Sequence, residues 1–477
     1  MTFLLAAACF GVLEPQGAHA GVLRVGNTAS SSIACKADDG SGRMFELSPG
    51  TTTAIAPVDG TLDSVTCGRL VLGGLGVRDT TPDRIVMLNG QQTMTLRVAL
   101  FPYLPTYPSG DLLALARMIE LGYQRFNPAT AVELSTNEDP YGFNTLQTTF
   151  STYDVVEVDT SILSMLVKNG WIVPVLRIGN PLPFAATAVM APNGNYYGTP
   201  TWVCRDFLFS YDTRLAPVTS LPQLLTYWQG LNTDSHVVAD FTGRWQLYSM
   251  YVNAYVARYG YGQQQIDSAL NQPVDSATMS DLVSIVNACA SAVIPTFNPC
   301  AAGVFHNDTP DGMMEPIFSS GFSATDLGFS ERSFFFELLR SMVPTVIPMP
   351  YGPKPVPLMY VDALTYSKRC TGICMLNAQT FARYLTSREV REQIAFGSDL
   401  DELLSGHPWR HLLPATEDFY YANAVKRDRI YASIASIFPS AKPMPTSIDE
   451  QTLNAASARV CVALVQQVPQ LKCSARQ

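Results

Sequence analysis

Segments with the period of a buried strand alternate with segments of helical period in the middle of this chain, and this alternation restricts its fold most strongly. Residues 96–100 form a nearly continuous apolar run, typical of a strand buried on both faces in a parallel sheet. Residues 109–128 then place apolar side chains on one helical face and end at Pro128, and residues 131–135 form another apolar strand. The pattern predicts a strand–helix–strand unit of an α/β protein.

A second unit of the same kind has a sharper boundary. The stretch "YDVVEVD", residues 153–159, reads as a buried strand, and residues 160–170 read as a helix that stops at Gly170. Asp159 therefore lies where a strand meets a helix, which is where ligands bind in open α/β sheets. A role restricted to capping the helix fits the same position.

The remainder of the chain continues the mixture of helices and strands. Helical patterns dominate residues 221–293, and strands and helices alternate again from residue 323 to residue 387. This order predicts two α/β lobes around a cleft. Before them, residues 21–93 contain short apolar runs between turn residues, which predicts a small β-rich N-terminal module.

The first twenty residues resemble a secretory signal peptide. An apolar run over residues 3–13 is followed by Ala18, His19 and Ala20, a pattern typical of cleavage after Ala20. No Lys or Arg precedes the run, so a buried first strand is the other interpretation. No later stretch reaches the roughly 20 apolar residues of a membrane-spanning helix. We therefore expect a soluble, secreted protein without a membrane span.

Ten cysteines support an oxidising compartment, and one of them stands apart. Cleavage after Ala20 removes Cys9 and leaves an odd number. Eight of the remaining cysteines fall into sequence-local couples, whereas Cys204 has no such neighbour; the couples are Cys35 with Cys67, Cys289 with Cys300, Cys370 with Cys374, and Cys461 with Cys473. We expect four disulfides and one thiol, and no zinc site, because no second pair has ligand spacing.

The charge balance limits the classes of molecule that we expect this chain to bind. The formal net charge is −9, and the Lys and Arg residues are scattered rather than gathered in a basic stripe. A nucleic-acid backbone is therefore not an expected partner. A cationic small molecule is compatible with this acidic chain.

Cys204, between Trp202 and Phe207, is a candidate nucleophile. A thiol must be ionised to attack carbon, so it needs a base or a positive environment. No His lies near it in the sequence, and Glu331, in the first turn of a helix that follows a strand, is the candidate base. The other reading of Glu331 is an acidic residue that complements the helix dipole.

Aromatic residues at the predicted strand ends would surround this thiol. Asp362 lies in an otherwise apolar strand, where a carboxylate needs a partner or a ligand. Together with Asp159 it would bind ring amines or a positive charge, while aromatic faces hold a flat heterocycle. The aromatic residues are Tyr103, Tyr197, Trp202, Phe329 and Tyr360.

Six segments resemble the thiaminase I family in order and approximate spacing, over about residues 94–440. They are "VALFPYLP", "YDVVEVDTSIL", "YYGTPTWVCRDFLF", "GFSERSFF", "PLMYVDALT" and "HLLPATEDFYY". The resemblance implies a type II periplasmic-binding-protein-like fold over residues 94–450, with one lobe at about 94–205 and 355–450 and the other at about 206–354. Residues 451–477 would form a C-terminal tail held by a disulfide.

The resemblance also implies a reaction. The thiazole of thiamine would be replaced by an amine or thiol, through addition of Cys204 to the pyrimidine ring and proton transfer by Glu331. It places Asp159 and Asp362 near the aminopyrimidine, and Tyr103 and Tyr360 along the cleft wall. Phe329 stands where the family often has Tyr. No cofactor or metal is expected for this chemistry.

Two other functions fit the same sequence. One is a non-catalytic extracellular or periplasmic binding protein for thiamine or a related pyrimidine, which would need no thiol beside a carboxylate. The other is an extracellular structural or adhesion protein, for which the N-terminal module is the only support.

Overall fold

The computed structural model describes most of the chain. The described residues are 22–56, 62–77, 84–100, 111–136, 145–210, 212–230, 237, 241–290, 297–303, 322–327, 345–396 and 412–473. The expected signal segment 1–20 and the site residues Tyr103, Phe329 and Glu331 lie outside these ranges. The chain divides into two compact units, the first formed by residues 1–98 and 120–138 and the second by residues 99–119 and 139–477. The domain boundaries expected from the sequence stay a prediction.

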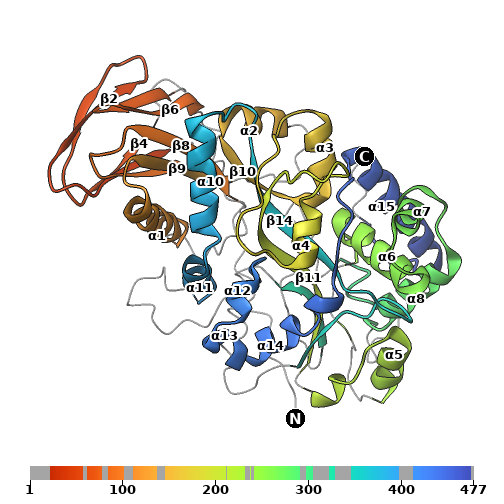
Figure 1. Ribbon diagram of the computed structural model, residues 1–477. Coiled ribbons are helices and arrows are strands. Elements are labelled where there is room, and N and C mark those ends of the chain that lie inside the picture. The colour runs from red at the N-terminus through yellow and green to blue at the C-terminus, as the bar shows by residue number, and fades with distance from the viewer. Residues whose placement is uncertain are drawn as a thin grey trace, which may run out of the picture. The chain divides into compact units, whose positions relative to one another are not determined.

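The first unit is built on two groups of strands (Figure 1). One group follows the order β4-β1-β7 and continues through β9 to β8. Its strands are β1 (Leu23–Asn27), β4 (Thr52–Ile55), β7 (Arg84–Leu88), β8 (Met94–Leu100) and β9 (Thr130–Thr136). β1 is parallel to β7 and antiparallel to β4. The other group is an antiparallel sheet of order β3-β2-β5-β6, from β2 (Ile33–Asp38), β3 (Met44–Leu47), β5 (Leu62–Cys67) and β6 (Leu70–Val77).

Buried charges lie inside the first unit. Arg84 Nη1 is 2.9 Å from Glu133 Oε1, and Arg97 Nε is 3.7 Å from Glu133 Oε2. Glu120, on helix α1 (Asp111–Phe126), accepts a hydrogen bond from the Met87 backbone N–H. Burial raises the pKa of Glu120 well above its ordinary value, and nearby Glu133 adds to the rise. The interior of this unit thus holds paired charges and one carboxyl group that favours its neutral form.

The second unit has a sheet of order β12-β11-β14-β10. Its long strand β11 (Thr199–Ser210) is antiparallel to β14 (Leu358–Tyr366), which in turn is antiparallel to β10 (Val155–Asp159). β12 (Phe322–Leu327) and β13 (Thr345–Pro348) pair with the second half of β11, and β15 (Lys442–Pro443) pairs with β14. The sheet around Cys204 is therefore antiparallel, unlike the parallel arrangement that buried apolar strands favour.

Helices cover both faces of β11 and β14. Leu208 and Leu358 pack in a cluster with α5, α6, α7, α8 and α15, whereas Val203 and Val361 pack in a cluster with α4, α13 and α14. These helices are α4 (Pro183–Ala188), α5 (Leu221–Gln229), α6 (Arg244–Tyr259), α7 (Gln263–Asn271), α8 (Ser276–Asn287), α13 (Asn423–Arg427), α14 (Arg429–Ala435) and α15 (Glu450–Gln467). Even and odd residues of β11 thus meet different cores, as strand alternation requires.

The other described helices of this unit are α2 (Leu146–Thr152), α3 (Leu163–Lys168), α10 (Ile373–Leu385), α11 (Arg388–Phe396) and α12 (Glu417–Tyr420). Of these, α11 and α12 add Ala395 and Phe419 to the cluster that contains Val203 and Val361. Among the described helices, none combines the length and hydropathy that a bilayer crossing requires.

Disulfides join all four expected cysteine couples. They are Cys35–Cys67, Cys289–Cys300, Cys370–Cys374 and Cys461–Cys473. Cys35 and Cys67 are opposite each other on β2 and β5, which brings their side chains together on one face. The predicted connectivity is confirmed, and Cys204 keeps its thiol.

Candidate functional site

Three neighbouring strands bring five of the predicted site residues onto one face of the sheet. Asp159 on β10 is opposite Asp362 on β14, and Asp362 is opposite Trp202 on β11. One step along the same face, Tyr360 is opposite Cys204. Opposite residues in an antiparallel pair share a face, and every second residue of a strand returns to it. The two carboxylates, the two aromatic rings and the thiol therefore occupy adjacent positions.

Asp159 ends β10 and caps the helical turn that follows. Its Oδ1 accepts a hydrogen bond of 2.6 Å from the Ser161 backbone N–H, at the start of the 3₁₀ turn Thr160–Ile162. Asp159 is 1% exposed and Asp362 is 5% exposed. The capping role is thus observed, and it holds this carboxylate at the strand end opposite Asp362.

Tyr360 is a partly buried hydroxyl next to this pair. Burial raises its pKa well above the ordinary value, and neighbouring Tyr248, on α6, adds to the rise. A side-chain hydrogen bond with Ser249 opposes it. The hydroxyl therefore stays protonated at neutral pH and can donate a hydrogen bond but not serve as a base.

Cys204 lies inside β11 and is 8% exposed. Its neighbour Arg205 faces the other way and donates hydrogen bonds of 3.1 Å to the carbonyl oxygens of Leu358 and Met349. Burial lowers the pKa of Arg205 to about 10, so it remains a cation at neutral pH. These bonds tie β11 to its neighbours beside Cys204, a role that the sequence reading missed.

Asp206 continues the same face of β11 and was also missed. Tyr351 donates a hydrogen bond of 2.6 Å to Asp206 Oδ2, and Gln246 Nε2 lies 3.4 Å from the same oxygen. The signal was present, because residues 202, 204 and 206 alternate with residues that face the other core. Continuing the two-residue alternation of the strand beyond Cys204 would have identified Asp206 as a residue of the same face.

Among the described residues, one further predicted site residue, Tyr197, lies away from this group. Tyr103, Phe329 and Glu331 lie outside the described residues, so the base expected for Cys204 stays a prediction. Tyr197 is buried in an apolar cluster with Phe150 and Val158 and is a core residue.

A cavity of about 660 Å³ has a lining that includes residues of α4, α12, α14 and β15. Phe184 and Phe438 line it, and both pack in the cluster that contains Val203 and Val361. Because residues 203 and 361 alternate with Cys204 and Tyr360, this cavity does not contain the thiol.

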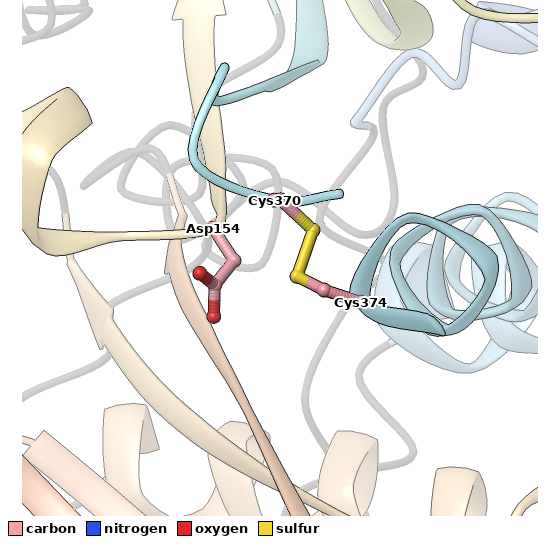
Figure 2. A group of neighbouring side chains, drawn as sticks. All are labelled: Asp154, Cys370 and Cys374. Carbon is pink, nitrogen blue, oxygen red and sulfur yellow. A yellow bond between two sulfur atoms is a disulfide. The ribbon is translucent and has the colours of Figure 1, made fainter. Parts of the chain in front are cut away.

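Asp154, Cys370 and Cys374 form a separate group with metal-ligand side chains (Figure 2). The two sulfur atoms are joined in a disulfide, so neither is available as a thiolate ligand. Arg369 Nε lies 3.3 Å from Asp154 Oδ1. In this state the disulfide and the Arg369–Asp154 ion pair have a structural role beside the start of α10.

Comparison with known proteins shows similarity at the level of the fold. No protein-family model and no curated protein sequence matches the chain. Thiaminase I from Bacillus thiaminolyticus is 21% identical, with a TM-score of 0.59 over 78% of this chain and 99% of the other. Clostridium botulinum thiaminase I in complex with thiamin is 18% identical, with a TM-score of 0.59 over 77% and 99% of the two chains.

A binding protein shares the same fold. The maltose-maltodextrin binding protein of Alicyclobacillus acidocaldarius is 15% identical, with a TM-score of 0.52 over 79% of this chain and 96% of the other. The predicted fold class, a type II periplasmic-binding-protein-like α/β fold with an additional β-rich part, is confirmed. These likenesses concern the fold, and the roles of the site residues stay predictions.

Proposed function

We propose that this chain is a thiamine-degrading transferase of the thiaminase I type, which replaces the thiazole of thiamine with an amine or a thiol. One observation carries the proposal: the Cys204 thiol, outside all four disulfides, shares a sheet face with Asp159, Asp362, Trp202 and Tyr360. The sequence resemblance and the shared fold support the same assignment.

The residues around the thiol suit a cationic substrate with a flat aminopyrimidine ring. Asp159 and Asp362 offer acceptors to the ring amine and stabilise positive charge in a buried setting. Trp202 and Tyr360 offer aromatic faces for stacking. Tyr360 also offers a hydroxyl that remains protonated.

In the proposed reaction, the Cys204 thiolate adds to the pyrimidine ring. Glu331, a predicted base, takes the thiol proton. The bond between the methylene and the thiazolium nitrogen then breaks, and its electron pair leaves with the neutral thiazole. The incoming amine or thiol adds to the methylene and gives up a proton, and the carbon–sulfur bond to Cys204 breaks with its electrons returning to sulfur.

The second candidate is a non-catalytic binding protein for thiamine or a related pyrimidine. The match to a maltose-maltodextrin binding protein favours it, because this fold also serves ligand capture. Binding requires the carboxylates and aromatic faces but not the thiol. For either function we propose an extracellular or periplasmic location, which the four disulfides favour.

Thiazole release from thiamine separates the two functions. The full chain is incubated with thiamine and a panel of amines and thiols, including aniline, and free thiazole is measured by chromatography. We expect release by the wild type and a loss of about 10³-fold or more in Cys204→Ser, as for removal of other catalytic nucleophiles. A binding protein would instead bind thiamine equally in both forms without release. Equal release by Cys204→Ser would exclude the covalent mechanism.

A further inference from the structure

Arg391, on α11, places a buried cation against Trp202, one of the residues that share a sheet face with Cys204. Its side chain is 0% exposed, and its guanidinium carbon lies 4.0 Å from the centre of the Trp202 ring. Trp202 precedes Cys204 by two residues on β11, a spacing of about 7 Å along a strand. The cation therefore lies beside the residues that surround the thiol.

The guanidinium has N–H donors for which the described part of the chain supplies no acceptor. Nε, Nη1 and Nη2 of Arg391 are buried, and none has a hydrogen-bond partner among the described residues. A guanidinium carries five N–H donors in one plane. Stacking on Trp202 uses its face and leaves the edges, where the N–H groups point, for acceptors in that plane.

Glu157 is a carboxylate of the described residues that acts on this cation. Glu157, two residues before Asp159 on the same face of β10, is fully buried and interacts electrostatically with Arg391. Burial lowers the pKa of Arg391 to about 10 and Glu157 opposes this, so Arg391 is charged at neutral pH. Glu157 supplies charge but no hydrogen bond to Arg391 in the described structure.

We infer that Arg391 binds an oxyanion carried by one of the two substrates, a carboxylate, sulfonate or phosphate group. This inference rests on the proposed function and specifies its substrate class. Two oxygens of an oxyanion accept paired hydrogen bonds from the edge of a guanidinium, which satisfies donors that the described residues leave open. Unesterified thiamine carries no such group, so the anion belongs either to the acceptor nucleophile or to a phosphate ester of thiamine.

The test compares matched neutral and anionic substrates in wild type and Arg391→Met. The acceptors are aniline and 3-aminobenzoate, and the donors are thiamine and thiamine monophosphate. We expect Arg391→Met to raise KM for the anionic member of one pair by about 10- to 100-fold, as for loss of hydrogen bonds to a charged group. KM for the neutral members stays within about threefold of the wild type. The affected pair identifies which substrate carries the anion.

Three further variants keep the test decisive. Arg391→Lys retains the positive charge and should keep part of the wild-type preference for the anionic substrate. It replaces Arg391→Met in the comparison if that variant folds poorly. Arg388→Met removes an exposed cation of the same helix, which is paired with Glu392 at 2.6 Å, and should leave all values unchanged. Glu157→Gln removes the competing carboxylate and should lower KM for the anionic substrate.

An equal change for neutral and anionic substrates in Arg391→Met would overturn the inference and make Arg391 a support for Trp202. If the wild type releases no thiazole with any pair of substrates, the proposed function is rejected. The role of Arg391 can then still be tested by measuring ligand binding. Calorimetry then compares thiamine, thiamine monophosphate and 3-aminobenzoate as ligands. The oxyanion site is supported if an anionic ligand binds more tightly to the wild type and Arg391→Met abolishes this gain in affinity. The site is rejected if no such gain is observed.

Discussion

Asp159 and Asp362 are directly opposite each other on β10 and β14, and both are buried. Two carboxylates at opposite positions of an antiparallel pair repel each other when both are ionised. A bound cation would relieve this repulsion. An ionised pair at these positions therefore favours a cationic ligand.

Asp362→Asn should stabilise the unliganded protein and weaken thiamine binding. The change removes one of two opposed charges, so the free energy of unfolding should rise by about 0.2–1 kcal/mol. The dissociation constant for thiamine should rise at least about tenfold, because a charged acceptor is lost. Denaturant titration and calorimetry measure the two effects. Asp63→Asn, an exposed residue of the first unit, serves as the control. A loss of stability in Asp362→Asn would show that the two carboxylates do not repel.

Stability should fall steeply above pH 10, because buried tyrosines resist ionisation in the folded chain. Burial raises the pKa of five tyrosines above the ordinary value of 10: Tyr248, Tyr360, Tyr366, Tyr420 and Tyr431. The unfolded chain therefore loses these hydroxyl protons at a lower pH than the folded chain. Rising pH favours unfolding for that reason. Each contributes up to about 1.4 kcal/mol per pH unit above that value. Denaturant titrations at several alkaline pH values measure the slope.

Tyr248→Phe should flatten this slope and raise stability at neutral pH. The Tyr248 hydroxyl is buried without a hydrogen-bond partner among the described residues, so its removal should stabilise the fold by about 1 kcal/mol. Exposed Tyr421 is the control, and Tyr421→Phe should leave the free energy of unfolding at neutral pH unchanged. An unchanged slope in Tyr248→Phe would contradict the assignment.

Two disulfides should differ in their contribution to stability. Cys35 and Cys67 are separated by 32 residues in sequence, whereas Cys370 and Cys374 are separated by 4. The chain-entropy relation gives about 4 kcal/mol for the first bridge and about 2 kcal/mol for the second. Scanning calorimetry of the two double Cys→Ala variants tests this order. The reverse order would indicate that native-state contacts, rather than loop length, decide the difference.

Glu120→Gln should stabilise the first unit at neutral pH. The folded chain holds Glu120 with a raised pKa, whereas the unfolded chain ionises it at ordinary values near 4.5. The contribution of Glu120 to the free energy of unfolding is therefore fully present below pH 4.5. It declines as the pH rises from 4.5 towards the raised pKa of Glu120 in the folded chain. The neutral Gln removes that decline and its oxygen can still accept from Met87. Thermal unfolding should show a higher Tm at pH 7.5 and no difference at pH 4.

Local patterns predicted the cysteine couples and the strand that ends at Asp159. In both cases the evidence lies within a short stretch, and the partners are close in sequence. Asp206 was within reach of the same reasoning, because it continues the alternation of Trp202 and Cys204. The fold class followed from the order of strands and helices, and from segments that resemble a known family.

Arg391 could not have been found in this way. It lies in a helix rich in charged residues, where an Arg is usually exposed. Its place beside Trp202 depends on how α11 packs over a strand almost two hundred residues earlier. The antiparallel order of β10, β14 and β11 depends equally on contacts between distant segments, which an apolar run does not specify.

Each disulfide joins cysteines that follow one another closely, and this has a consequence for biogenesis. A chain that emerges from its N-terminus at about 5–20 residues per second can close Cys35 with Cys67 before Cys204 appears. Cys204 then emerges before either member of the Cys289–Cys300 couple. Vectorial synthesis thus favours pairing of Cys35 with Cys67 before the Cys204 thiol can compete for either of them.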